Sequence, residues 1–210
     1  MTVDREALGK LSPDVAPLLL GAILVSDLDG AEVAVRLTEV EAYNGPDDPA
    51  SHSYRGRTPR NAVMFGPPGF LYCYFTYGMH WCANVVCGPE GVATAVLLRA
   101  GEVIRGAEAA AARRPAARRP SDLARGPARL ATCLALSRDT NGLDLCDPAS
   151  SVRLESLGSP GAEIRSGPRV GITLAADRPW RFWLDGDPSV SMFRAGGRNR
   201  VATPRQTGTP

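Results

Sequence analysis

The sequence predicts an α+β fold, with a curved, mostly antiparallel β-sheet flanked by helices. Three stretches rich in β-branched and aromatic residues, 31–43, 70–87 and 92–99, are bounded by glycine, proline or short polar residues, as strands and hairpins are. Two stretches rich in alanine and leucine, 102–114 and 128–136, predict helices. Strands that follow one another through short turns are typical of an antiparallel sheet.

Length and composition favour one domain. The chain has 210 residues, of which 44% are hydrophobic, and this suffices for an ordinary core. We find no internal repeat and no second boundary, so residues 1–194 are predicted to form a single domain. The tail 195–210 is rich in glycine, basic and polar residues, which predicts flexibility. The net charge is +2, and arginine supplies nearly all the positive charge, a bias that a GC-rich genome explains as well as phosphate binding does.

The cysteines and the chain start indicate the class of protein. Five cysteines are odd in number and form no CxxC pair, which argues against a disulfide framework and a zinc site. They are Cys73, Cys82, Cys87, Cys133 and Cys146. No apolar run approaches the ~20 residues of a membrane helix, and MTVDREALGK lacks the apolar core of a signal peptide. We expect a soluble intracellular protein with reduced thiols, without metal and without membrane association.

The first elements are a short helix at 4–10, a turn at 12–19, and strands at 22–25 and 31–43 around the turn 27–30. In the long strand, two-residue alternation places these residues on one face: Val33, Val35, Leu37, Glu39, Glu41 and Tyr43. A carboxylate that continues a buried face loses hydration, so its pKa tends to rise and it becomes a usable general base or acid. The alternative is that this face leaves the core and both glutamates are solvated.

Residues 44–69 form a long loop dense in glycine, proline and short polar residues, and such loops are usually functional or disordered. Four residues make it cationic: His52, Arg55, Arg57 and Arg60. Met64 and Phe65 can fix it to the core. We expect an ordered loop over a site, and the alternative is a solvated excursion.

The stretch 70–87 reads as a hairpin whose tip carries Tyr77, Gly78 and Met79. Hairpin tips normally carry polar turn formers, so an aromatic ring here is a candidate wedge. The alternative is that Tyr77 folds back onto the protein. If Tyr74 and Asn84 serve one pocket, they must share a face, which requires a loop of three residues and not two.

The strand 92–99 ends in a lone charge, Arg99, on the same face as Leu97. Such an arginine is commonly an exposed cap. If its face is shared with Glu41, however, it can hold that carboxylate ionised and help to fix a water molecule.

The rest of the chain is less informative. The basic run 113–120 is expected to be a solvated linker, with phosphate contact as the alternative. Arg125 precedes a helix start that can attract a phosphate. Strands are predicted at 152–155, 169–174 and 181–184, and a loop at 156–167.

Several blocks, in order and spacing, resemble the alkyladenine (3-methyladenine) DNA glycosylase family. They are TEVEAY from Thr38, GPDDPASHS up to Ser53, TPRNAVMF, LYCYFTYGMHWCANV and VLLRA, and more thinly GPARLATCLAL, GPRVGI and PWRFWLDGDPSVS. The resemblance implies the fold shared by this family and formyltransferase C-terminal domains, with the hairpin projecting towards DNA. It also implies a monofunctional enzyme of base-excision repair without cofactor, which flips a damaged purine and hydrolyses its N-glycosidic bond.

The resemblance assigns roles to individual residues. Glu41 resembles the base that activates water, Arg99 the arginine that holds this water, and the main-chain carbonyl of Val170 its third anchor. The pocket for the flipped base would comprise Tyr43, His52, Tyr74, Asn84 and Leu97, with Asn84 colliding with the exocyclic amine of guanine. Tyr77 resembles the residue inserted into the vacated stack, with Met79 beside it. Phosphate contacts are expected from Arg57, Arg60, Arg125 and Arg169.

The expected substrates are 3-methyladenine, 7-methylguanine, hypoxanthine and ethenoadenine in double-stranded DNA. A monomer in the cytoplasm, associated with the nucleoid of a bacterium, is expected. Two other readings stay open. One is a nucleic-acid binding module without catalysis, whose aromatic hairpin stacks on bases. The other is a glycoside hydrolase that uses Glu39 and Glu41 as its pair, although that chemistry needs groups on opposite sides of the scissile bond.

Overall fold

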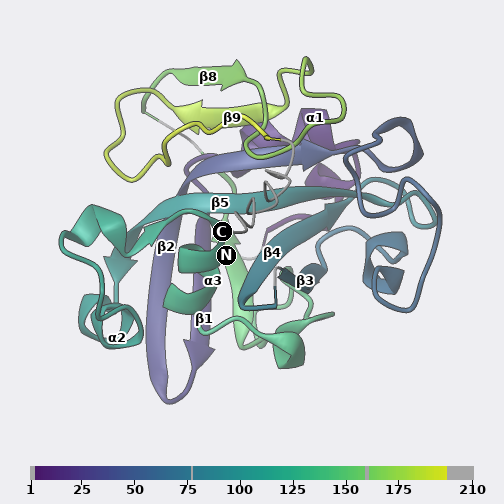
Figure 1. Ribbon diagram of the computed structural model, residues 1–210. Coiled ribbons are helices and arrows are strands. Elements are labelled where there is room, and N and C mark those ends of the chain that lie inside the picture. Colours follow the sequence, from purple (N-terminus) through teal and green to yellow (C-terminus); the bar gives the residue numbers. More distant parts are fainter. Residues whose placement is uncertain (1–2, 77, 159–160, 198–210) are drawn as a thin grey trace, which may run out of the picture.

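The computed structural model describes residues 3–76, 78–158 and 161–197. Within them, nine strands form one curled antiparallel sheet with short helices packed around it, so the predicted α+β fold is confirmed (Figure 1). The strands are β1 (Ile23–Leu28), β2 (Ala31–Tyr43), β3 (Leu71–Thr76), β4 (His80–Cys87), β5 (Thr94–Arg105), β6 (Ala124–Arg125), β7 (Val152–Ser156), β8 (Ile164–Gly167) and β9 (Arg181–Leu184). The α-helices are α1 (Ser12–Val15), α2 (Ala107–Arg113) and α3 (Pro127–Cys133). Short 3₁₀-helices lie at Arg5–Leu8, Ala16–Leu19, Gly45–Asp47, Ala62–Phe65, Pro120–Asp122 and Arg138–Thr140.

The long strands β2 and β5 pair along most of their length and form the centre of the sheet, whose order is β3-β4-β5-β2-β1-β7. Helix α3 packs against β4, β5 and β6 inside the curve of the sheet, whereas the hairpin β8–β9 attaches to β2 at one end of the molecule (Figure 1). The main core lies between the sheet, α3 and the N-terminal turns.

Strand β2 changes the direction of its side chains near Thr38. The main core takes odd-numbered residues before this point and even-numbered residues after it: Val33, Val35, Leu37, Val40 and Ala42. The register with β5 shifts on both sides of Glu39, which marks a β-bulge. The outer edge of β2 also changes partner here, from β1 to β9.

The bulge overturns the expectation that Glu39 and Glu41 continue the apolar face of Val33. Both carboxylates lie on the opposite face of the sheet, yet both side chains are fully buried, so the solvated alternative is wrong as well. Gly101 permits the close approach of β5 at this point, because a Cβ atom there would lie 2.2 Å from a methyl group of Val35.

The β3–β4 hairpin has the register that the sequence argument required. Thr76 pairs with His80, so three residues separate the paired ends, and Tyr74 and Asn84 share one face of the sheet. That register check is confirmed. Tyr77 itself lies outside the described residues.

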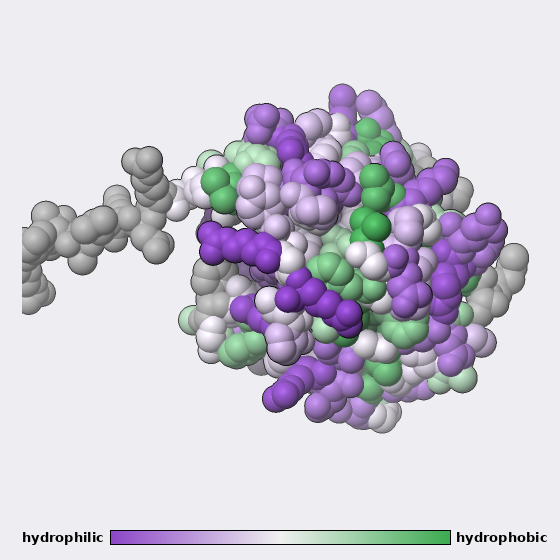
Figure 2. Space-filling model, turned by 90° about the vertical axis from the view of Figure 1, so that its right-hand side faces the viewer, coloured by the Kyte–Doolittle hydropathy of each residue, from purple (hydrophilic) through white to green (hydrophobic). Residues whose placement is uncertain are grey.

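The loop 44–69 is ordered and folds over this same face. Met64 is buried in a second, smaller apolar cluster with Tyr72, Val86, Ala93 and Ala95. Figure 2 looks onto the side of the molecule where the loop lies, and its surface is largely hydrophilic with apolar residues in small patches. The alternative interpretation of residues 44–69 as a solvated loop without contacts to the core is therefore wrong.

Three predictions in the second half of the chain are wrong. Strand β5 continues through Arg105, because Glu102 pairs with Arg36 and Arg105 with Glu32 across the sheet, so the helix begins only at Ala107. Residues 164–167 form β8 instead of a loop, since they pair with β9. Residues 169–174 form no strand.

The basic run 113–120 is not simply a solvated linker. Arg113 donates hydrogen bonds to the carbonyls of Cys133 and Leu28, and Arg114 donates to Leu123. These bonds fasten the end of α2 to the body of the domain.

The five cysteines are free thiols. Among the described residues, no helix combines the length and apolar character that a membrane crossing requires. Most of the predicted flexible tail, residues 198–210, lies outside the described part of the chain.

Candidate active site

A pocket of about 260 Å³ opens between the sheet, the loop 44–69 and the segment around Val170. This volume lies just below the roughly 300–1,000 Å³ usual for drug-sized ligands, so it suits a compact ring system. Its walls are Tyr43, Ala50, Ser51, His52, Met64, Tyr72, Tyr74, Thr76, Cys82, Asn84, Leu97, Arg99, Pro127, Val170, Gly171 and Ile172. The structure thus brings the predicted base-pocket residues together around one cavity.

Glu41 is buried beside this cavity and receives polar contacts from three directions. The main-chain N–H of Val170 donates to its Oε1 at 2.6 Å, and the hydroxyl of Tyr43 donates to its Oε2 at 3.0 Å. A guanidinium nitrogen of Arg99 lies 3.4 Å from the same Oε2. Val170 thus reaches Glu41 through its N–H, and the expected contact between its carbonyl and the attacking water stays a prediction.

Burial raises the pKa of Glu41, and this effect outweighs the opposing influence of Arg99, Val170 and Tyr43. A carboxyl with a raised pKa is a stronger proton acceptor once ionised. The arrangement can therefore act as a general base towards a water molecule in the pocket.

Glu39 has a different environment, although it stands only two residues away. Its Oε1 accepts from Arg99 at 2.8 Å and from Arg181 at 2.7 Å, and its Oε2 accepts from the N–H of Ser191 at 2.7 Å. Burial alone would raise its pKa, but the two arginines hold it below the usual range. Such a carboxylate is fully engaged and cannot serve as the acid of a glycoside-hydrolase pair, so this alternative has no support.

Aromatic rings form the walls of the pocket. The rings of His52 and Tyr74 pack edge to face with their centroids 4.4 Å apart, and the rings of Tyr72 and Tyr74 stack with their centroids 5.7 Å apart. Burial, followed by the charge of Arg60, lowers the pKa of His52, which favours a neutral imidazole. A flat ligand can insert among these rings.

Several residues of the pocket wall were not predicted from the sequence, and three of them lie on the hairpin strands. Tyr72, Thr76 and Cys82 lie on the pocket face of β3 and β4, and two-residue alternation would have identified all three. Asn84 itself donates to the carbonyl of Tyr72 at 3.0 Å, which fixes its amide in the wall.

Two apolar side chains at and near the hairpin tip are exposed. Met79 is 67% exposed and Phe75, on the outer face of β3, is 43% exposed. The intercalation role of Tyr77 concerns a residue outside the described part of the chain.

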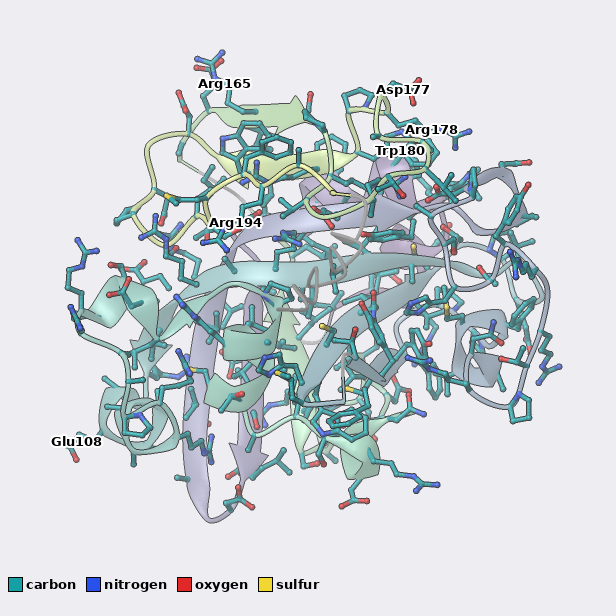
Figure 3. All side chains as sticks on the ribbon, viewed as in Figure 1. Glu108, Arg165, Asp177, Arg178, Trp180 and Arg194 are labelled. Atoms are coloured by element: carbon teal, nitrogen blue, oxygen red, sulfur yellow. The ribbon has the colours of Figure 1, made fainter. Side chains whose placement is uncertain are left out.

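The four arginines predicted to contact phosphate differ in accessibility. Arg57 and Arg60 are exposed on the loop, and Arg60 donates to the carbonyl of Phe75 at 2.7 Å. Arg125 is partly buried and lines a groove together with Arg99 and Arg194. Arg194 is labelled in Figure 3. The predicted phosphate contact of Arg169 is wrong, because its side chain is fully buried against Asp48 and no phosphate can reach it.

Among the described residues, no group of three or more His, Cys, Asp or Glu side chains converges as metal ligands do.

The chain is similar in sequence to known proteins over most of its length. The family model described as methylpurine-DNA glycosylase (MPG) matches residues 7–188. A protein of Streptomyces avermitilis is 52% identical over 204 residues, covering 96% of each chain, and one of Nocardia farcinica is 54% identical over 213 residues, covering 97% of this chain and 99% of its own. A protein of Mycobacterium bovis is 53% identical over 185 residues, covering 86% of this chain and 88% of its own. All three have names that assign them provisionally as 3-methyladenine DNA glycosylases.

Proposed function

The chain belongs to the methylpurine-DNA glycosylase family and is thus a DNA N-glycosylase of alkylated-purine repair. From this premise we propose that its pocket holds a flipped purine, and that a water molecule activated by Glu41 cuts the bond between this base and its sugar. The observation that carries the proposal is the burial of Glu41 beside an aromatic pocket, with Arg99, Tyr43 and the N–H of Val170 around it.

The chemistry follows from these contacts. Ionised Glu41 takes a proton from a water molecule, the water oxygen bonds to the sugar C1′, and the C1′–N bond breaks with its electron pair moving to the base. Arg99 and Glu41 together orient the water. A cationic base such as 3-methyladenine leaves as a neutral molecule, so it needs no proton from the enzyme.

The aromatic walls favour alkylated purines. Such bases carry positive charge, and a cation is attracted to the faces of Tyr43 and Tyr74. Weakly paired lesions also cost less to extrude from the duplex, so some discrimination precedes entry to the pocket. Asn84, fixed in the wall by its bond to Tyr72, disfavours normal guanine by a collision with the exocyclic amine of that base. 7-Methylguanine has the same amine but carries a positive charge and is a better leaving group, so it stays in the proposed substrate range.

Neutral lesions, hypoxanthine and ethenoadenine, belong to the proposed substrate range but require protonation to leave. For them we expect a bell-shaped dependence of the excision rate on pH. For a cationic lesion, only the ionisation of Glu41 should limit the rate. Identical losses of rate for both lesion types at high pH would argue against a general acid.

Base flipping is assigned to the hairpin tip. A side chain that fills the vacated stack offsets part of the few kcal/mol that extrusion costs. We assign this role to Tyr77, with Met79 beside it, while Arg57, Arg60 and Arg125 contact the phosphates of one duplex bound by a monomer. The proposed location is the bacterial cytoplasm, at the nucleoid.

The decisive experiment incubates the protein with duplexes that each contain one 3-methyladenine analogue, hypoxanthine or ethenoadenine, and measures base release. Wild type should release at least one of these bases, and Glu41→Gln should bind the same duplex without release. Release by Glu41→Gln at the wild-type rate would exclude Glu41 as the base.

A further inference from the structure

The ion pair between Asp48 and Arg169 lies behind the pocket wall without lining the pocket. Both side chains are fully buried, and a guanidinium nitrogen of Arg169 lies 2.8 Å from Oδ1 of Asp48. Replacing a buried ion pair with apolar residues is often neutral or stabilising, so such a pair is weak evidence for a role in stability. Its position relative to the site is more informative.

Asp48 holds the start of the loop that forms one wall. Besides Arg169, its carboxylate accepts from the main-chain N–H groups of Asn44 at 3.3 Å and Ala50 at 3.2 Å. Ala50 itself lines the pocket, and Ser51 and His52 follow it directly. The position of this wall therefore depends on the carboxylate of Asp48.

Arg169 holds the opposite wall and one of the aromatic rings. It donates to the carbonyl of Ala42 at 2.9 Å, and its guanidinium carbon lies 4.6 Å from the ring centroid of Tyr43. It also lies 5.3 Å from the ring of Trp180, which Figure 3 labels beside Arg178 in the segment leading into β9. The next residue along the chain is Val170, whose N–H contacts Glu41.

We propose that Asp48 and Arg169 are positioning residues for the excision reaction, joining the loop wall, the ring of Tyr43 and the Val170 segment into one rigid frame. This inference rests on the proposed role of Glu41. The pair acts through two groups: Arg169 supports the ring of Tyr43, which faces the flipped base, and it holds the N–H of Val170 against the carboxylate of Glu41.

Several groups face Glu41 and act on its ionisation. Arg99 comes from β5, the N–H of Val170 from its loop, and the remaining groups are Tyr43 and Glu39 of β2, Tyr74 of β3 and Cys82 of β4. Two of these donors depend on Arg169: the N–H of Val170 lies in the segment that it anchors, and the hydroxyl of Tyr43 belongs to the ring that it supports. Because both bonds favour the ionised carboxyl, the loss of either raises the pKa of Glu41.

The experiment measures single-turnover excision of a cationic lesion as a function of pH for Arg169→Lys and Asp48→Asn. Lysine keeps the charge but has neither the planar face nor the fork of arginine. A displacement of the reacting groups by about 1 Å can cost roughly 100-fold in rate, so we expect a loss of about 10-fold to 100-fold in the rate constant, with a much smaller loss in affinity for lesion DNA. The acid limb of the profile should move to higher pH.

A matched control separates positioning from stability. Arg113→Ala removes bonds to the carbonyls of Cys133 and Leu28, and none of these residues lines the pocket, so it should lower the melting temperature without moving the acid limb. The double variant Asp48→Asn/Arg169→Gln removes both charges and leaves none unpaired, and it replaces the single variants if they do not fold.

The outcomes are distinct. A slower rate together with a shifted acid limb supports the frame. The proposal would be overturned if the acid limb of the folded variants had the same pH midpoint as wild type and their rate fell only in proportion to the folded fraction. The proposed function is judged separately, by base release from wild type and its absence in Glu41→Gln.

Discussion

Arg99 is held more closely by Glu39 than by Glu41: its Nε lies 2.8 Å from the former carboxylate, and its terminal nitrogen lies 3.4 Å from the latter. Glu39 is also bound by Arg181 and Ser191, so it acts as a fixed anchor. The closer contact of Arg99 with Glu39 agrees with the pKa directions, which are lowered for Glu39 and raised for Glu41. Two glutamates that stand two residues apart on one strand therefore have different electrostatic environments.

The variant Glu39→Gln, which removes this anchor, should be less stable than wild type and should have a different pH profile of excision. Arg99 and Arg181 lose their shared counter-charge, and breaking a buried pair in this way costs about 3–5 kcal/mol of unfolding free energy. The charge of Glu39 contributes to the raised pKa of Glu41, so its loss should move the acid limb of the excision profile to lower pH. Urea unfolding and single-turnover rates across pH measure the two effects.

The surface pair of Glu102 and Arg36 provides the control for this variant. Glu102 is 52% exposed, so Glu102→Gln should change the stability by less than about 1 kcal/mol and leave the profile unmoved. If Glu39→Gln behaved like Glu102→Gln, the anchoring role would be rejected.

Glu41→Gln should have the opposite effect on stability. The folded protein holds the pKa of Glu41 above its unfolded value, so ionisation of this group opposes folding, and stability falls as pH rises through the window between the two values. The glutamine variant avoids this loss and should be more stable than wild type at pH 7, by about 1.4 kcal/mol for each unit of pKa shift. The difference should disappear at a pH below the unfolded pKa of the carboxyl.

Thermal unfolding at pH 7 and at about pH 4, near the ordinary glutamate pKa, tests this prediction. A glutamine variant that is less stable than wild type at both pH values would mean that Glu41 contributes to folding as Glu39 does. Inactivity combined with added stability is the pattern expected of a residue kept for chemistry.

The sequence predicts those parts of the fold that depend on local patterns. The bounds of β2 and β9 were predicted from the composition of these stretches, and alternation places Leu97 and Arg99 on one face. The register of the hairpin was required by a pocket shared by Tyr74 and Asn84. It does not reveal the bulge at Thr38, because the change of partner from β1 to β9 depends on residues more than 100 positions away. The prediction that Glu41 lies on the same face of the sheet as Val33 was wrong for that reason.

The supporting contacts of the site are long-range for the same reason. Asp48 and Arg169 are 121 residues apart, and Glu39 and Ser191 are 152 residues apart. No periodicity connects such residues, and a buried arginine in GPRVGI reads from the sequence as a surface charge. The groups that line the pocket were therefore easier to predict than the groups that hold them.

His52 offers a direct electrostatic test, because the chain has only two histidines. Burial and then the charge of Arg60 lower its pKa. Arg60→Ala should therefore raise the pKa of His52, which NMR titration of the ring protons would measure. Arg57→Ala is the matched control, since Arg57 lies over Phe65 and does not contribute to the shift. An equal shift in both variants would assign the effect to net charge alone.

The hairpin tip provides the last prediction. If Tyr77 fills the gap left by the flipped nucleotide, Tyr77→Ser should slow the excision of a well-paired lesion strongly, because extrusion then costs a few kcal/mol without compensation. It should affect a mismatched lesion less, since that base is easier to extrude. The variant should unfold within a few degrees of wild type, and Ile104→Ser, at an exposed apolar position of β5 that has no assigned role, measures the effect of losing apolar surface alone. A large fall in the melting temperature of Tyr77→Ser, with excision lost only in proportion to unfolding, would show instead that the ring packs against the body of the protein.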